Sequence, residues 1–183
     1  MTRPRTKRVH GALILVDFIN HFKFEGASSL APRAVKAARN AAKLKAHIKS
    51  KGGTCIYAND NFGVWDSEFS SLVRHCIAQD GASREIAEIL RPARGDLSVI
   101  KPRHSAFYGT PLEFLLDHLE VTTLTIAGIA LDMCVLATVY DAHIRKFTVR
   151  VPANCVAGFS KAQEISALTM IKRLGCEVAG YRI

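Results

Sequence analysis

The sequence predicts a single α/β domain in which a mostly parallel sheet is covered by helices on both faces. Apolar runs typical of buried strands alternate with stretches of helical spacing from one end of the chain to the other. No Pro- or Ser-rich linker, low-complexity segment or internal repeat interrupts this alternation. A chain of 183 residues is also the right size for one domain with a sizeable core.

Six segments have the pattern of strands. The first, "GALILVDF", is a continuous apolar run that ends in an acid, as expected for a strand buried on both faces. The expected strands are residues 11–18, 54–60, 96–103, 122–130, 147–155 and 176–180.

Five segments between these strands are expected to be helices. The longest is rich in Ala, Lys and Leu, and the glycines at 52–53 end it. Ser83 and Thr110 are expected N-caps, and Pro111 stands at the first helical position. The polar stretch that precedes Ser83 is expected to be a long loop. The expected helices are residues 31–51, 83–91, 110–119, 132–146 and 161–175.

The charge pattern excludes some functions. The net charge is +9, and part of it lies in the N-terminal run "MTRPRTKR". A signal peptide is not expected, because the apolar run at 12–16 ends at Asp17. Nucleic-acid binding is not favoured, because the other Lys and Arg residues are scattered without interleaved aromatic residues. We expect residues 1–8 to be a frayed basic tail and residues 9–183 to be one domain. No apolar stretch reaches the length of a membrane span.

The cysteine count indicates a reducing compartment. The number of cysteines is odd, and no pair has a metal-type spacing such as C-x-x-C. We therefore expect a cytoplasmic protein with reduced thiols and without a disulfide framework. The five cysteines are Cys55, Cys76, Cys134, Cys155 and Cys176.

Four polar side chains stand at the expected ends of neighbouring strands. Asp17 ends the first strand, Asp60 the second and Lys101 the third, and Cys134 lies in the first turn after the fourth. Ligands bind beyond the carboxyl ends of the strands in parallel sheets of this kind. We therefore expect these groups to point into one crevice.

Each of these groups has a chemical use there. The helix N-terminus and Lys101 are expected to favour a thiolate at Cys134. Asp17 is suited to take a proton and return it to a leaving group, and N–H groups in the turn at 130–134 are suited to hold an oxyanion. Each group also has a non-catalytic interpretation: an acid that caps a helix or a loop, a solvated lysine, and a small buried cysteine. Their convergence favours a reactive site.

Three segments carry a resemblance to a known family. "ALILVDFINHF", "VIKPRHSAFYGTPLEFLL" and "LTIAGIALDMCVLATVYDA" resemble the isochorismatase-like cysteine hydrolases, which include nicotinamidases and N-carbamoylsarcosine amidase. The resemblance covers about residues 9–180. It implies a catalytic triad of Asp17, Lys101 and Cys134.

The resemblance implies further structural features. The family has a non-proline cis peptide before the nucleophile, here Ile129–Ala130, and an oxyanion hole made by the N–H groups of Ala130 and Cys134. The implied fold is a three-layer αβα sandwich with Rossmann-like topology around a six-stranded sheet. The family is usually assembled as homodimers or homotetramers.

The implied activity is hydrolysis of an amide or ureido bond of a small molecule through a thioester. Asp17 deprotonates Cys134, protonates the departing amine and then activates water, while Lys101 keeps Asp17 ionised. Two alternatives stay open: hydrolysis of an ester or ether on the same scaffold, and a non-catalytic binding protein that keeps the fold.

Departures from the family pattern narrow the range of possible substrates. Isochorismatases that cleave a vinyl ether lack the cysteine that this chain keeps. The D-W-H-P…H metal motif of nicotinamidases is missing, because only Asp60 remains in "NDNFGVWDSEF". We therefore expect no catalytic zinc and no cofactor, and for Asp60 an ion pair or a loop cap. Ile19 replaces a common Gln, and it makes the entrance more apolar than usual if its side chain points there.

The substrate pocket is expected to be lined by aromatic and amide side chains in loops, although the same residues also suit loop anchors or dimer contacts. The seven histidines show no metal-ligand spacing, and we treat them as structural or surface residues. His104, three residues after Lys101, is the first candidate for an exception. The expected pocket residues are Phe22, Asn61, Phe62, Trp65, Phe107 and Tyr108.

Overall fold

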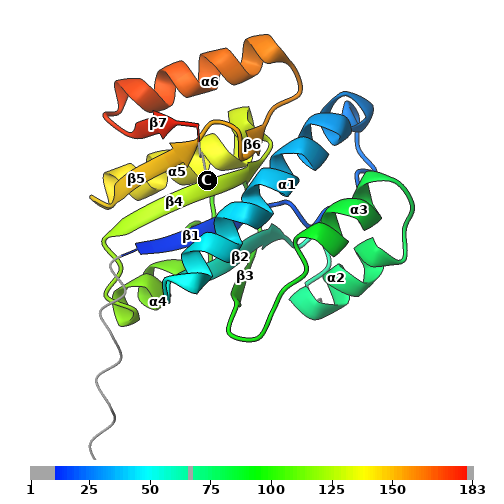
Figure 1. The fold of residues 1–183 in the computed structure, drawn as a ribbon, viewed down its shortest axis with the longest axis horizontal. Helices are drawn as coiled ribbons and strands as arrows, with labels where there is room; N and C mark the ends of the chain where they lie inside the picture. Colours follow the sequence, from blue (N-terminus) through cyan, green and yellow to red (C-terminus); the bar gives the residue numbers. More distant parts are fainter. Residues whose placement is uncertain (1–10, 66–67, 181–183) are drawn as a thin grey trace, which may run out of the picture.

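A parallel sheet forms the centre of the computed structural model, which describes residues 11–65 and 68–180 (Figure 1). The strand order is β3-β2-β1-β4-β5-β7, every pairing is parallel, and the short β6 pairs with β4. The strands are β1 Gly11–Val16, β2 Thr54–Asp60, β3 Leu97–Lys101, β4 Thr123–Ile129, β5 Thr148–Pro152, β6 Val156–Ala157 and β7 Glu177–Ala179.

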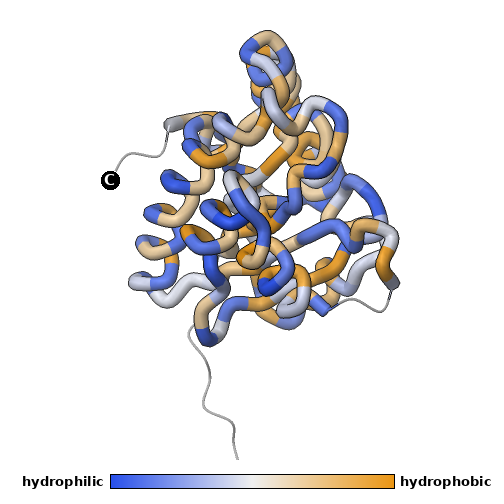
Figure 2. The backbone as a smooth tube through the Cα atoms, turned by 90° about the vertical axis from the view of Figure 1, so that its right-hand side faces the viewer, coloured by the Kyte–Doolittle hydropathy of each residue, from blue (hydrophilic) through white to orange (hydrophobic). Residues whose placement is uncertain are grey.

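Helices cover both faces of this sheet. Leu13 and Leu15 of β1 belong to an apolar cluster with α1, α2 and α3, whereas Ile14 and Val16 belong to a cluster with α4, α5 and α6. In Figure 2, hydrophilic and hydrophobic residues alternate along the coiled segments, as expected for helices that bury one side. The helices are α1 Ala27–Ser50, α2 Phe69–Ile77, α3 Ala82–Ile89, α4 Leu112–His118, α5 Leu136–Ile144 and α6 Lys161–Arg173, and a π-helical turn, η1, spans Leu131–Val135.

The predicted fold class is confirmed, since the structure is a three-layer sandwich with a parallel sheet in the middle. The expected strand at 147–155 is shorter than predicted, and β6 follows it as a separate strand. Successive strands are added on one side of β1 up to β3 and then on the other side from β4 onward. The point where the order reverses lies between β1 and β4, which is where such sheets open a crevice.

The expected loop before Ser83 is wrong, because it contains α2. This helix buries only Val73 and Cys76, which are three residues apart, and Phe69 at its start packs on Tyr57 with ring centroids 5.1 Å apart. So small an apolar stripe in a polar segment gives a weak helical signal.

Two predicted caps differ in outcome. Ser83 is not an N-cap, because α3 begins at Ala82 and the buried Ser83 hydroxyl donates to the Cys76 carbonyl (3.3 Å). Thr110 does accept a hydrogen bond from the N–H of Leu112, the first residue of α4 (3.2 Å). It therefore caps this helix, although it lies two residues before Leu112.

The expected basic tail at 1–8 lies outside the described residues. Within the described part of the chain, no helix is long and apolar enough to cross a membrane.

Candidate active site

The four strand-end side chains do meet at the carboxyl edge of the sheet. Asp17 follows β1, Asp60 ends β2, Lys101 ends β3, and Cys134 lies in η1 directly after β4. These four strands are adjacent in the order β3-β2-β1-β4. The site therefore lies beside the reversal of strand order.

Asp17 and Lys101 form a buried ion pair. The Lys101 Nζ lies 2.7 Å from Asp17 Oδ2, and the two side chains are 0% and 6% exposed. The other oxygen of Asp17, Oδ1, accepts a hydrogen bond from the backbone N–H of Asp60 (2.7 Å). The Asp17 backbone has a positive φ of 51° and donates to the Ala58 carbonyl (3.0 Å). Neighbouring strands thus fix both the backbone and the carboxylate of Asp17.

Lys101 connects the acid to the thiol. Its Nζ lies 3.6 Å from Cys134 Sγ and 3.7 Å from Asp60 Oδ2, and it donates to the Arg103 carbonyl (3.0 Å). An ammonium group that is fully buried needs such partners, because an unpaired charge would be costly in the interior.

Cys134 differs from the other cysteines in its exposure. The four others are buried, whereas Cys134 is half-buried. Its Sγ lies 3.5 Å from His104 Nδ1, and its carbonyl accepts a hydrogen bond from the Thr138 hydroxyl (2.7 Å). The backbone that carries the sulfur is therefore held by α5, and the exposed His104 contacts the sulfur itself.

The strand before the nucleophile approaches β1 closely. A Cβ atom at Gly128 would lie 2.2 Å from the Val16 carbonyl oxygen, so only glycine fits there. The Ile129–Ala130 peptide bond that follows is cis, and the Ala130 carbonyl accepts hydrogen bonds from the N–H groups of Met133 and Val135. The oxyanion-hole roles of Ala130 and Cys134 stay predictions.

Burial dominates the electrostatics of the acid and the thiol. Burial raises the pKa of Asp17, although the Lys101 ammonium opposes this. Burial, and then the Asp17 charge, raise the pKa of Cys134, and Lys101 opposes both. Burial lowers the pKa of Lys101, but Asp17 and Cys134 outweigh it and leave that pKa raised.

The raised pKa of Cys134 opposes the thiolate that the sequence predicts. Lys101 does not offset burial and the nearby carboxylate, so these surroundings favour the thiol form. A carboxylate with a raised pKa is the better proton acceptor for such a thiol.

The predicted pocket residues are dispersed. Trp65 and Tyr108 are 83% and 63% exposed, and Phe62 packs against His21 with ring centroids 4.4 Å apart. Asn61 is buried, and its side chain accepts from the Gly63 N–H (3.0 Å). Phe22, half-buried, packs at the edge of the apolar cluster beneath α1.

Phe107 lies in the core, where its ring packs against Phe147 and beneath the Arg145 guanidinium. No substrate defines the pocket, so the assignment of all six residues to it stays a prediction.

The side chain of Ile19 does not point into the entrance of the site, so the expected apolar contribution there is wrong. Its side chain is fully buried in the cluster beneath α1, and its carbonyl accepts a hydrogen bond from the buried Asn59 (2.7 Å). Local sequence could not reveal this, because the direction of the side chain depends on how the chain turns after Asp17.

Asp60 has both of the non-catalytic roles expected for it, an ion pair and a loop cap. It contributes to the ion pair with Lys101, and its Oδ1 accepts from the Phe62 N–H (2.6 Å). Within the residues that the structure describes, no three His, Cys, Asp or Glu side chains are grouped so that they could hold a metal ion. The described residues thus provide no ligand set like the zinc motif of nicotinamidases.

One contribution was missed by sequence reasoning. Thr138 is fully buried in α5, and its Oγ1 accepts from the Ala106 N–H (3.0 Å) while its hydroxyl donates to the Cys134 carbonyl. It joins the loop after β3 to the nucleophile turn. A threonine in a helix gives no signal of such a link in the sequence.

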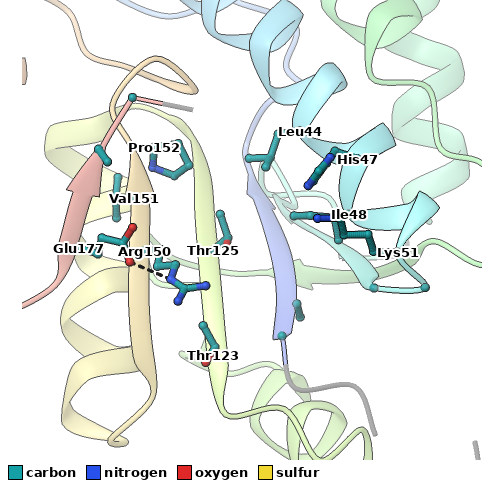
Figure 3. A pocket seen from close by; sticks show the side chains of 16 residues that line it. Leu44, His47, Ile48, Lys51, Thr123, Thr125, Arg150, Val151, Pro152 and Glu177 are labelled. Atoms are coloured by element: carbon teal, nitrogen blue, oxygen red, sulfur yellow. Dashed lines mark hydrogen bonds and ion pairs between the residues drawn. The ribbon is translucent and has the colours of Figure 1, made fainter. Parts of the chain in front are cut away.

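A separate cavity lies at the opposite end of the sheet. It has a volume of about 520 Å³ and lies between the C-terminal turns of α1 and strands β4, β5 and β7, where Arg150 and Glu177 form an ion pair (2.9 Å; Figure 3). Gly11 and Gly180 at its border adjoin the parts of the chain that the structure does not describe. None of the triad residues lines it.

Comparison with known proteins identifies the family. The model of the isochorismatase domain matches residues 11–181. The isochorismatase family protein YaaI of Bacillus subtilis is 36% identical over 163 residues, which are 89% of each chain. Maleamate amidohydrolase of Pseudomonas putida is 28% identical over 153 residues, covering 79% of this chain and 71% of that one.

A solved structure agrees with these relatives. The crystal structure of nicotinamidase/pyrazinamidase PncA from Bacillus subtilis superposes with a TM-score of 0.74 and 27% identity, over 92% of this chain and 98% of that chain.

Proposed function

Because the chain belongs to the isochorismatase family, we propose that it is a cysteine amidohydrolase that cleaves a carbon–nitrogen bond of a small molecule. One observation carries the proposal: a half-buried thiol lies 3.6 Å from a buried ammonium group that is paired with a buried carboxylate. A relative that is named an amidohydrolase supports the choice of bond.

The first half of the reaction is acylation. Asp17 takes the proton of Cys134, and the resulting thiolate attacks the carbonyl carbon of the substrate. Lys101 faces both groups, so its positive charge stabilises the thiolate as it forms. The oxyanion is held by the N–H groups of Ala130 and Cys134.

The tetrahedral intermediate then collapses. Asp17 returns its proton to the nitrogen, the carbon–nitrogen bond breaks, and ammonia or an amine leaves. The acyl group stays on Cys134 as a thioester, and water hydrolyses it. No metal takes part in this scheme, because the described residues offer no ligand cluster and Asp60 is engaged by Lys101.

The same family membership supports the assembly that we propose. We propose a homodimer or homotetramer in the cytoplasm, with residues 9–183 as the catalytic domain and no cofactor. Light scattering of the purified chain tests the assembly.

Ammonia release from a panel of small amides and ureido compounds tests the function. We expect release by the wild type to be unaffected by a chelator and to be lost in Cys134→Ala. Cys134→Ala should keep the melting temperature of the wild type, because a half-buried thiol adds little to the core. Chelator-sensitive release, or release that survives in Cys134→Ala, would contradict the proposal.

The alternatives are separated when small esters are added to the panel and the alkylation of Cys134 is measured beside it. Hydrolysis of esters without amide turnover, still dependent on Cys134, would favour an esterase on the same scaffold. An absence of all turnover with an unreactive Cys134 would favour a binding protein.

A further inference from the structure

His104 contacts the nucleophile from its exposed side. Its Nδ1 lies 3.5 Å from Cys134 Sγ, within hydrogen-bonding distance for sulfur. Asp17 and Lys101 approach the same sulfur from the interior, where both are buried, whereas the His104 side chain is exposed. The sulfur thus lies between a buried acid–base group and an imidazole that solvent can reach.

The segment that carries His104 is fixed on both sides. The Arg103 carbonyl just before it accepts a hydrogen bond from Lys101 Nζ (3.0 Å). Ala106, two residues after it, donates to Thr138, which in turn donates to the Cys134 carbonyl. The chain on either side of His104 is therefore tied to the triad itself, and the contact with the sulfur is part of the site.

The two halves of the reaction place different demands on a base. In acylation the proton comes from Cys134 and is needed again by the leaving nitrogen, so a buried carboxylate can keep it. In deacylation the proton comes from water that enters from solvent. Asp17 lies on the buried side of the sulfur and is paired with Lys101, whereas His104 lies on the exposed side. The exposed imidazole is better placed to meet that water.

We propose that His104 is the general base of deacylation, a role that the family resemblance assigns to Asp17. This inference rests on the proposed function. His104 takes one proton of the water as its oxygen attacks the thioester carbon. The carbon–sulfur bond then breaks, and the imidazolium returns the proton to the departing Cys134 sulfur, which its Nδ1 already faces. Thioester and water thus become a carboxylic acid and a free thiol, and both side chains regain their starting forms.

p-Nitrophenyl acetate tests this division, because it acylates a reactive thiol whatever the natural substrate is. The burst of nitrophenol reports acylation, and the steady rate that follows reports deacylation. His104→Asn keeps a polar group near the Nδ1 position but does not act as a base. His118→Asn, at an exposed histidine at the end of α4, is the matched control.

We expect His104→Asn to keep a burst of about one equivalent while its steady rate falls about 100-fold, within the usual range for a lost general base. Intact-protein mass spectrometry should show an acetyl group that accumulates in this variant and is absent when Cys134 is Ala. Hydroxylamine, which needs no base to attack a thioester, should restore the turnover of His104→Asn. His118→Asn should behave like the wild type.

A steady rate equal to that of the wild type would overturn the inference and leave the proposed function intact. So would a burst that falls in parallel with the steady rate, because the defect would then lie in acylation or in folding. The absence of any Cys134-dependent release of nitrophenol by the wild type, in the burst or in the steady state, would count against the proposed function itself. If His104→Asn does not fold, His104→Gln is measured in its place and the same outcomes apply.

Discussion

At the scale of single residues, the site depends on which group holds a proton at rest. Burial and the nearby Asp17 carboxylate raise the pKa of Cys134, and burial also raises the pKa of Asp17. Lys101 favours the charged form of both neighbours. A raised thiol pKa protects the sulfur against chance oxidation or alkylation, and in the proposed mechanism the sulfur becomes a nucleophile when Asp17 takes its proton.

Asp17→Asn separates these effects. The amide cannot accept the thiol proton, so we expect kcat/KM on any active amide to fall at least ~1000-fold. The same change removes the negative charge that raises the pKa of Cys134 and leaves Lys101 beside the sulfur. Alkylation of Cys134 by iodoacetamide at neutral pH should therefore become faster than in the wild type.

Asp80→Asn serves as the control, because Asp80 is exposed and far in sequence from the triad. Slower alkylation of Cys134 in Asp17→Asn would show that the carboxylate activates the resting thiol instead of restraining it, and would contradict this view.

At the scale of elements, a buried acid joins helix α1 to the start of β3. Asp96 forms ion pairs with Lys45 and Lys49 of α1, and its side chain is 1% exposed. It also accepts a hydrogen bond from the Ala93 N–H (2.7 Å), and Lys45 contacts the hydroxyl of Tyr57 (2.7 Å) in β2. This cluster holds the C-terminal half of α1 against the sheet far from the triad.

The cluster predicts a pH dependence of stability. Burial would raise the pKa of Asp96, but the Ala93 N–H and the two lysines outweigh it, so the folded pKa lies below the usual value near 3.8. The stabilisation from this carboxylate is therefore fully present above that value and is lost as pH falls through the folded pKa. We expect Asp96→Asn to lower the free energy of unfolding by about 3 kcal/mol at pH 7, because it leaves the buried Lys45 and the half-buried Lys49 without their anion.

Urea denaturation between pH 2 and pH 7 measures this. The difference between the wild type and Asp96→Asn should shrink as the pH falls below 4. Glu85→Gln, which removes a more exposed ion pair with Arg39, should change stability by less than ~1 kcal/mol. A difference between wild type and Asp96→Asn that stays constant with pH would show that the Asp96 charge does not stabilise the fold.

At the scale of the whole molecule, the proposed reaction uses side chains from one edge of the sheet. The proposed triad comes from the carboxyl ends of β1 and β3 and from the turn after β4, all inside the region matched by the family model. The basic run at residues 1–8 lies outside that region. We therefore expect removal of residues 1–8 to leave kcat and KM on an active amide unchanged within about twofold, as for a tail that does not join the domain.

Binding of single-stranded DNA at several salt concentrations tests the alternative hypothesis that residues 1–8 bind nucleic acid. The full chain should bind no more tightly than the truncated chain at physiological salt. Salt-dependent binding that disappears with residues 1–8 would instead support a nucleic-acid arm.

The sequence by itself determined the sheet and the residues at its edge. Alternating apolar runs and helical segments are local patterns, and parallel strands bring their carboxyl ends to one side, so these patterns alone place Asp17, Lys101 and Cys134 together. The tertiary structure alone decided what depends on burial and on contacts between distant segments. The raised pKa of Cys134, the burial of Ile19 and the contact of His104 with the sulfur are of this kind. Each arises from neighbours that are far away in the chain, and local sequence patterns do not predict such contacts.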